Sequence, residues 1–204
     1  MTSRSDLDWR QDAPEGEKKK PGMTPPALRL LMRQRTIIIA KPVDRTLMER
    51  VTASLLVLDG CSPQKLITVF VNSPGGDADS GFAIYDAMRF VKAPLRTICS
   101  GLAASAAVPI FLGGRKGMRF CWPNSRFLLH QPSMQMMGAA SDIEITSREI
   151  ERVREKYNKI VEEETGRAMN KVKSDTNRDF WLTASEAVEY GLVTRIVTRA
   201  TELD

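Results

Sequence analysis

The stretch between Gly101 and Ala107 limits most strongly what this chain can fold into. It reads GLAASAA, so a single serine, Ser105, stands among small residues. A run typical of a β-strand, residues 95–99, leads into it, and an apolar segment, residues 106–112, leads out of it. This order predicts a strand, a tight turn and a helix. At such a turn Ser105 is either a nucleophile, lifted clear of the sheet toward the free N–H groups of the helix, or merely the cap of a buried helix.

Strands and helices alternate along the rest of the chain. Short β-branched and apolar runs predict strands, and apolar residues at helical spacing predict the helices between them. The expected strands cover residues 36–40, 66–71, 95–99, 118–121, 127–130 and 192–197. The expected helices cover residues 27–35, 44–60, 79–91, 106–112, 141–166 and 183–191. Such alternation indicates an α/β fold with right-handed parallel units.

The helix expected over residues 141–166 differs from the others. Ser141 and Glu144 match a capping box, and Gly166 marks the end. Most of its surface is charged, and its apolar stripe is narrow. The stripe consists of Ile143, Ile150, Val153, Tyr157, Ile160 and Val161. A long helix with so narrow a stripe packs on something outside its own core, so we expect an oligomer contact.

Length and composition indicate one soluble domain. The 204 residues suffice for a single core, which we place at residues 27–204, and the polar residues 1–26 predict a flexible arm. The net charge of +5 comes from interleaved acidic and basic residues, without the basic and aromatic stripe of a nucleic-acid-binding surface. No apolar run is long enough to span a membrane, no secretory signal is visible, and the cysteines lack metal-ligand spacing. We therefore expect a cytoplasmic protein without metal, membrane or nucleic-acid partners.

Three further features offer partners for a serine nucleophile. His130, the only histidine, lies at the end of an apolar strand, where sites form in open α/β sheets. Asp179 precedes two aromatic residues and can orient an imidazole from a buried position. Gly75 and Gly76 allow a close backbone approach, so that their N–H groups can bind an oxyanion. Each feature has an ordinary alternative: a structural histidine, a salt bridge and a plain turn.

Several motifs, taken together, resemble the ClpP family, the proteolytic subunits of the Clp protease. The resemblance covers residues 30–197, and the motifs occur in the family's order. They are 71–76 (VNSPGG), 83–86 (AIYD), 101–105 (GLAAS), 120–132 (FCWPNSRFLLHQP), 142–145 (DIEI), 178–179 (RD) and 186–193 (EAVEYGLV). The resemblance favours the nucleophile over the helix cap.

The resemblance implies a serine endopeptidase that needs no cofactor. In such an enzyme Ser105 is the nucleophile, His130 is the general base and then the acid, and Asp179 holds the imidazole. The backbone N–H groups of Gly76 and Ala106 form the oxyanion hole.

The resemblance also implies an architecture and partners. The fold is expected to be the crotonase-like spiral of ββα units. A protruding handle at about residues 131–166 joins two heptameric rings into a tetradecamer, and Arg178 helps to tie the rings together. An AAA+ unfoldase, which uses the ATP, delivers unfolded proteins. It docks at subunit boundaries in pockets that include Thr68, Phe70 and Phe90.

Three departures from the family keep other functions open. The polar arm replaces an apolar segment expected at the pore, and Thr68 stands where an aromatic residue is common. Pro109 removes the helical N–H partner of the Ser105 carbonyl, which either distorts the turn or leaves the carbonyl to water. A second hypothesis is therefore a conditionally active or structural ring subunit that requires another ClpP paralogue. A third, an acyl-CoA enzyme of the crotonase class, shares the fold, but such enzymes rely on carboxylates where this chain has a serine and a histidine.

Overall fold

The computed structural model describes residues 25–131 and 139–203, which are organised around a seven-stranded sheet. The strands follow the order β1-β2-β3-β4-β7, while β5 pairs with the end of β3 and with β6. All pairs are parallel except β5 with β6. The strands are β1 (Thr36–Ile39), β2 (Ile67–Ser73), β3 (Leu95–Ala104), β4 (Arg119–Cys121), β5 (Arg126–Leu129), β6 (Phe180–Thr183) and β7 (Arg195–Ile196). The predicted α/β class is confirmed, and the antiparallel β6 lies where the sequence predicted no strand.

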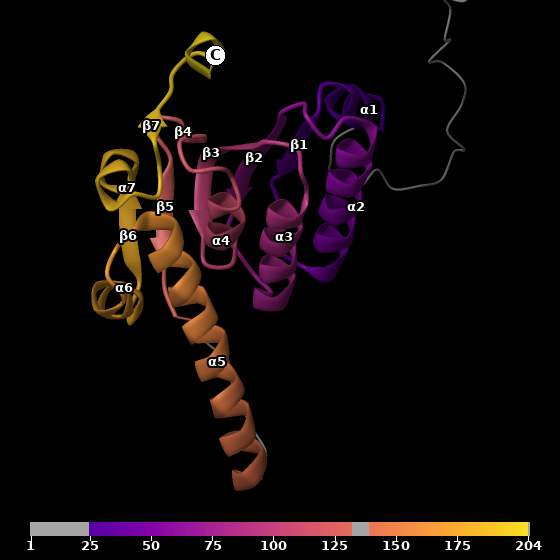
Figure 1. Ribbon diagram of the computed structural model, residues 1–204. Coiled ribbons are helices and arrows are strands. Elements are labelled where there is room, and N and C mark those ends of the chain that lie inside the picture. Colours follow the sequence, from indigo (N-terminus) through magenta and orange to yellow (C-terminus); the bar gives the residue numbers. More distant parts are fainter. Residues whose placement is uncertain (1–24, 132–138, 204) are drawn as a thin grey trace, which may run out of the picture.

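Helices cover one face of the sheet, and one of them leaves the body of the molecule (Figure 1). Helices α2, α3 and α4 lie side by side, and α5 projects beyond the sheet. The helices are α1 (Pro25–Arg33), α2 (Arg45–Cys61), α3 (Ala78–Phe90), α4 (Ala107–Leu112), α5 (Ala140–Thr165), α6 (Met169–Thr176), α7 (Ala184–Tyr190) and the 3-10 turn η1 (Ala200–Leu203). None of these described helices is long and apolar enough to cross a membrane.

The predicted arm lies almost entirely outside the described residues. Residues 1–24 are not described, and α1 begins at Pro25, two residues inside the arm predicted for residues 1–26. The predicted handle, about residues 131–166, is described as α5, while residues 132–138 lie outside the described part.

The two faces of the sheet pack differently. On β2, Ile67, Val69 and Val71 are fully buried in the core beneath the helices. Successive side chains of a strand point to opposite faces, so Phe70 lies on the other side. There it packs against a small second cluster formed by Ile98, Phe120 and Val197. The sheet therefore has an apolar surface away from the helices as well as toward them.

Strand β3 is longer than the sequence predicted. It continues past residue 99 to Ala104, and its two halves have different neighbours, β4 and then β5. The register with β2 shifts beyond Val71, where the Asn72 side chain accepts a hydrogen bond from the Leu102 N–H at 3.1 Å. The strand therefore continues past Gly101 (φ 153°), and the chain turns at Ser105, where the sequence predicted the turn.

Helix α5 has 26 residues, or about 39 Å at 1.5 Å per residue. Its N-cap is Ala139, without a side-chain hydrogen bond, so the predicted capping box of Ser141 and Glu144 is wrong. The predicted end is confirmed, because Gly166 adopts the left-handed conformation of a helix C-cap.

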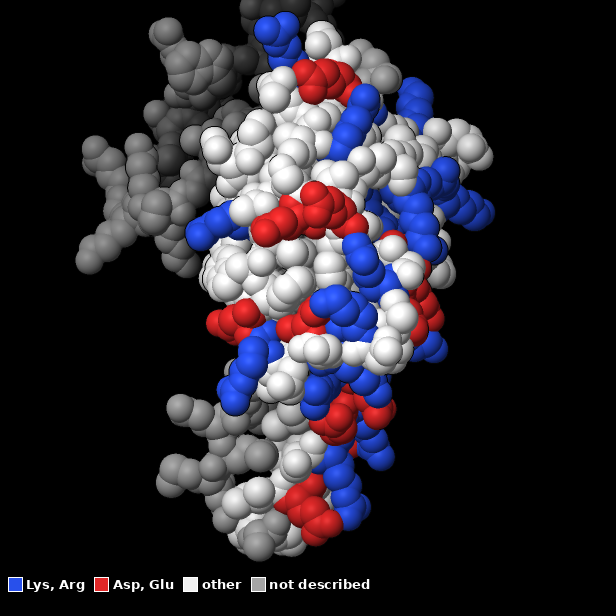
Figure 2. Space-filling model, turned by 90° about the vertical axis from the view of Figure 1, so that its left-hand side faces the viewer, with Lys and Arg blue, Asp and Glu red and all other residues white. Residues whose placement is uncertain are grey.

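The two halves of α5 have different surroundings. Tyr157 and Val161 in the second half are buried in the core, so the prediction that the apolar stripe packs outside the chain's own core is wrong for this half. In the first half, Ile143 and Ile145 are 40% and 60% exposed. Figure 2 shows acidic and basic side chains interleaved along the projecting helix, where pairs such as Glu144 with Arg148 lie one turn apart. Of the predicted apolar stripe, the exposed residue is Ile143, in the first half.

A buried ion pair fixes the base of α5. Arg119 on β4 and Glu164 on α5 form a salt bridge with side chains only 3% and 6% exposed. The Arg119 guanidinium also donates to the carbonyl oxygens of Gly114 (2.8 Å) and Glu164 (3.0 Å), and the Tyr85 hydroxyl donates to Glu164 Oε1 at 2.9 Å. Burial lowers the pKa of Arg119, and the Glu164 carboxylate opposes this effect. A buried arginine without such a partner would be very costly, so α5 is held in place at this end.

Candidate active site

The turn after β3 presents Ser105. Its φ of 54° is a left-handed conformation that is uncommon for residues other than glycine. Its N–H donates to the Leu128 carbonyl on β5 at 2.9 Å, and α4 begins two residues later at Ala107. The predicted strand, turn and helix are therefore present, with a sparsely populated backbone conformation at the serine itself, a feature that often marks functional sites.

Pro109 does not disturb this turn. The Ser105 carbonyl accepts a hydrogen bond at 2.9 Å from the Val108 N–H, one residue before the proline. Pro109 lies in the first turn of α4, where a missing N–H is tolerated. The expectation of a distorted turn or an unpaired carbonyl is wrong, because a tighter bond to the third residue replaces the bond to the fourth.

A second turn, between β2 and α3, lies against Ser105. A Cβ atom on Gly75 would lie 2.5 Å from the Ala104 oxygen and 2.7 Å from Ser105 Cβ, so only glycine permits this approach. The next residue, Gly76, pairs with Val43 in an isolated bridge. The Gly75–Gly76 backbone is thereby held beside the serine, which is where donors for an oxyanion at Ser105 must lie.

His130 and Asp179 meet because β5 and β6 are antiparallel. Leu129, the last residue of β5, pairs with Phe180, the first of β6, so the residues just beyond this pair face each other. His130 Nδ1 lies 3.3 Å from Asp179 Oδ1. Their side chains are 26% and 67% exposed, so Asp179 is not the buried residue that the sequence suggested. The antiparallel β6, which the sequence did not reveal, accounts for the contact.

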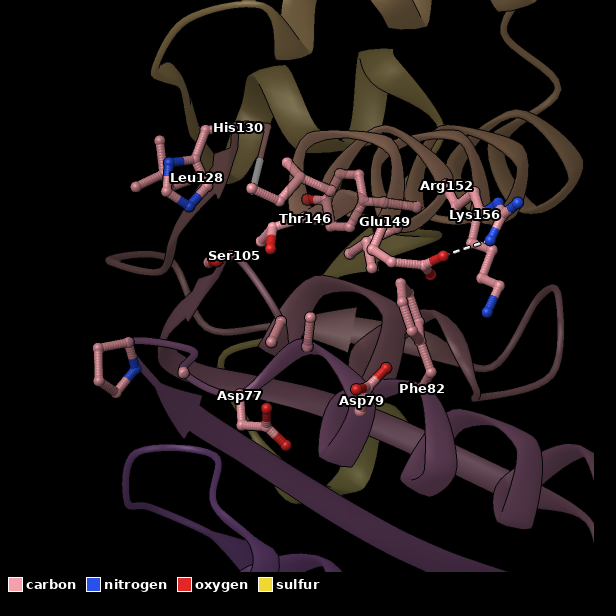
Figure 3. Close-up of a pocket in the computed structure, with 17 residues that line it drawn as sticks. Asp77, Asp79, Phe82, Ser105, Leu128, His130, Thr146, Glu149, Arg152 and Lys156 are labelled. Carbon is pink, nitrogen blue, oxygen red and sulfur yellow. Dashed lines mark hydrogen bonds and ion pairs between the residues drawn. The ribbon is translucent and has the colours of Figure 1, made fainter. Parts of the chain in front are cut away.

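Ser105 and His130 line one cavity of about 670 Å³. Figure 3 shows Asp79 and Phe82 of α3 on one side of it and residues of α5 on the opposite side. The α5 side includes Thr146, Glu149, Ile150, Arg152, Val153, Lys156 and Tyr157. A cavity of this size accommodates several side chains of an extended peptide. The role of α5 in the cavity wall was not predicted, although the spacing of its apolar stripe already placed Ile150, Val153 and Tyr157 on one face.

The arrangement supplies the components of acyl transfer. It combines a hydroxyl on a tight turn, an imidazole beside a carboxylate and a glycine turn close to the hydroxyl. Contact between Nδ1 of His130 and Asp179 leaves Nε2 free for proton transfer. Among the side chains drawn in Figure 3, no hydrogen bond joins Ser105 to His130. Such contacts are often long before substrate binds, so the missing bond is compatible with a catalytic pair.

The residues predicted to contact other chains do not form one site within a single chain. Thr68 and Phe70 lie on the face of β2 away from the helices, where the Phe70 ring centre is 6.2 Å from that of Trp122. Phe90 is 79% exposed at the end of α3, which covers the opposite face. Arg178 is exposed in the loop between α6 and β6. A pocket containing both Phe70 and Phe90 therefore needs two chains.

Comparisons with known proteins agree with the geometry. The family model described as Clp protease matches residues 24–200. A protein of Treponema denticola named ATP-dependent Clp protease proteolytic subunit 2 is 43% identical over 190 residues, which is 93% of this chain and 95% of the relative. The protein of the same name from Treponema pallidum is 46% identical over 83% of this chain and 85% of its own length. A solved ClpP1 mutant from Listeria monocytogenes superposes with a TM-score of 0.80 at 36% identity, over 86% of this chain and 98% of that one.

Proposed function

This chain belongs to the Clp protease family and is a peptidase subunit, and we propose that it cleaves peptide bonds with Ser105 as nucleophile, His130 as base and Asp179 as the residue that orients the base. The observation that carries the proposal is the turn at Ser105. Its backbone conformation is strained, a glycine packs against it, and it opens into the same cavity as the only histidine of the chain. A helix cap needs none of these features.

The proposed reaction follows from the positions of these groups. The Ser105 oxygen attacks the peptide carbonyl while His130 Nε2 accepts its proton, and Asp179 stabilises the imidazolium through Nδ1. The N–H groups of Gly76 and Ala106 bind the oxyanion of the tetrahedral intermediate. His130 then gives its proton to the leaving amine, and the acyl-enzyme is hydrolysed by water that His130 activates in turn.

The assembly and its partners are also part of the proposal. Two heptameric rings stack into a tetradecamer through the exposed half of α5, with Arg178 close to the contact. An AAA+ unfoldase of the Clp type delivers unfolded proteins and docks where Thr68 and Phe70 of one chain meet Phe90 of the next, since one chain does not bring them together. The peptidase uses no cofactor of its own and works in the cytoplasm.

A second candidate function is a subunit that is active only together with a second ClpP paralogue. The observation that favours it is the absence of a hydrogen bond between Ser105 and His130 in Figure 3, together with the 67% exposure of the Asp179 side chain. Both Treponema relatives are named subunit 2. On this reading, contact with another subunit supplies the alignment that the single chain lacks.

Hydrolysis of a fluorogenic peptide tests the proposal. The wild-type protein should cleave it, and Ser105→Ala should reduce kcat by about 10⁴- to 10⁶-fold. Ser100→Ala is the control, because Ser100 lies on the same strand and lines no part of the cavity. Equal activity of the Ser105 variant and the wild type would refute the proposal. Native mass spectrometry of the same sample separates the two candidates: an active homomeric tetradecamer rules out the need for a paralogue.

A further inference from the structure

Tyr157 carries a buried hydroxyl that has no role in the proposed cleavage reaction. The residue is 5% exposed and lines the cavity together with Ser105 and His130. Its hydroxyl is inaccessible to solvent and has no hydrogen-bond partner among the described residues. A buried hydroxyl without a partner is destabilising, and proteins rarely retain one unless another state of the molecule satisfies it.

Buried polar contacts tie the neighbourhood of Tyr157 to the His130 segment. The next residue on α5, Asn158, is 1% exposed and accepts a hydrogen bond from the Thr176 hydroxyl at 2.9 Å. The Thr176 carbonyl in turn accepts a bond from the Gln131 N–H at 2.7 Å. Three elements, α5, α6 and the chain after β5, therefore meet beside the histidine.

The electrostatic surroundings of Tyr157 agree with this placement. Burial raises the pKa of Tyr157 above its ordinary value, and the nearby Tyr190 adds to the rise. The backbone of His130 acts on the same hydroxyl in the opposite direction, although the two groups do not form a hydrogen bond of normal geometry in the structure. Because His130 also lines the same cavity as Tyr157, we take its backbone as the polar group that can satisfy the hydroxyl.

We propose that Tyr157 is a positioning residue for His130. A small shift of α5 relative to β5 closes a hydrogen bond between the Tyr157 hydroxyl and the His130 backbone, and this bond holds the histidine where its imidazole reaches Ser105. The proposal rests on the proposed roles of Ser105 and His130. It makes the position of α5, the helix that projects from the body, a determinant of catalytic alignment.

The substitution Tyr157→Phe tests this role, because it removes the hydroxyl and keeps the ring. In the assembled full-length protein, kcat for a fluorogenic peptide should fall about five- to tenfold, the usual effect of one hydrogen bond, with KM unchanged. In the unassembled subunit, the thermal midpoint should stay the same or rise, since the hydroxyl has no partner among the described residues of the single chain.

Tyr190→Phe is the matched control. Tyr190 is also 5% exposed, but its hydroxyl donates to Asp175 Oδ2 at 3.1 Å. This variant should have a lower thermal midpoint and an unchanged kcat. A merely structural tyrosine at position 157 would instead leave kcat unchanged, as in Tyr190→Phe.

Hydrogen exchange at the His130 and Gln131 amides gives a readout that is independent of turnover. It should be faster in Tyr157→Phe than in wild type and unchanged in Tyr190→Phe. A kcat within twofold of wild type, or unchanged exchange at these amides, overturns the positioning role. If Ser105→Ala retains activity, the proposed function fails, and the exchange experiment still decides whether Tyr157 holds the His130 backbone.

Discussion

The two sides of the candidate active site are built with different degrees of constraint. On one side, Ser105 is fixed by a hydrogen bond to the Leu128 carbonyl and by the glycine turn packed against it. On the other side, His130 and Asp179 meet at 3.3 Å, with Asp179 two-thirds exposed. The first side is enclosed by the core of the sheet, whereas the second lies at the ends of two strands.

This difference shows which of the proposed catalytic groups a single chain can hold in position by itself. The proposed nucleophile and oxyanion donors depend on close backbone packing between β2, β3 and α4 within one chain. The proposed base depends on β5, β6 and the helices behind them, and α5 is the element that also extends away from the body. Regulation by assembly would therefore act on His130 and leave the Ser105 turn unchanged.

The largest expected effect comes from removing the base. His130→Ala should lower kcat/KM by about 10⁵- to 10⁶-fold, because it removes the imidazole that is proposed to accept the serine proton. The loss of kcat/KM in Asp179→Ala should be at least about tenfold smaller than the loss in His130→Ala, because the carboxylate is exposed and only orients the imidazole. Peptide hydrolysis measured for both variants tests the comparison, and equal losses would show that Asp179 is as tightly integrated as His130.

The next effect concerns the side of the site that is fixed by the core. Gly75→Ala should lower kcat by about 10²- to 10³-fold, because the added Cβ would displace the turn that carries the proposed oxyanion donor. Gly117→Ala is a matched control, since both glycines have φ of 86° but no atom lies within 4 Å of a Cβ at Gly117. The control should lose about 1 kcal/mol of stability and no activity. Equal activity of the two variants would mean that the contact with Ser105 is not required.

A smaller effect tests the attachment of α5. Glu164→Gln leaves the buried Arg119 guanidinium without a countercharge and should cost about 3 kcal/mol in the free energy of unfolding. Glu144→Gln, which breaks an exposed pair with Arg148 on the same helix, should change it by less than about 0.5 kcal/mol. Denaturant unfolding of both variants measures the difference. If the two substitutions cost the same free energy, the pair of Arg119 and Glu164 does not anchor α5.

Sequence patterns predicted the surroundings of Ser105 better than the contact between His130 and Asp179. The strand, turn and helix around Ser105 follow from local apolar runs and small residues, and the close approach of Gly75 follows from residue type. The contact between His130 and Asp179 depends on β6, a four-residue strand whose partner lies about fifty residues earlier in the chain. Such long-range pairing leaves little local signal, so neither the strand nor the exposure of Asp179 could be predicted.

Helix α5 is a second element whose long-range contacts could not be predicted from the local sequence. The sequence predicted its apolar stripe, but a stripe does not indicate whether the surface it packs against lies in the same chain. Tyr157 and Val161 pack into the core, while Ile143 and Ile145 remain exposed. The one local signal for the anchor is Arg119 within an otherwise apolar strand, because a buried guanidinium requires a partner such as Glu164.

Reaction with a serine-directed β-lactone, followed by peptide mapping, tests the central claim most directly. We predict that the label is found on Ser105 in the assembled wild-type protein and that His130→Ala abolishes it, because the nucleophile depends on the base. The Ser100→Ala variant should be labelled as the wild type is. Absence of label from Ser105, with or without a second subunit, or labelling that persists in His130→Ala would contradict the account.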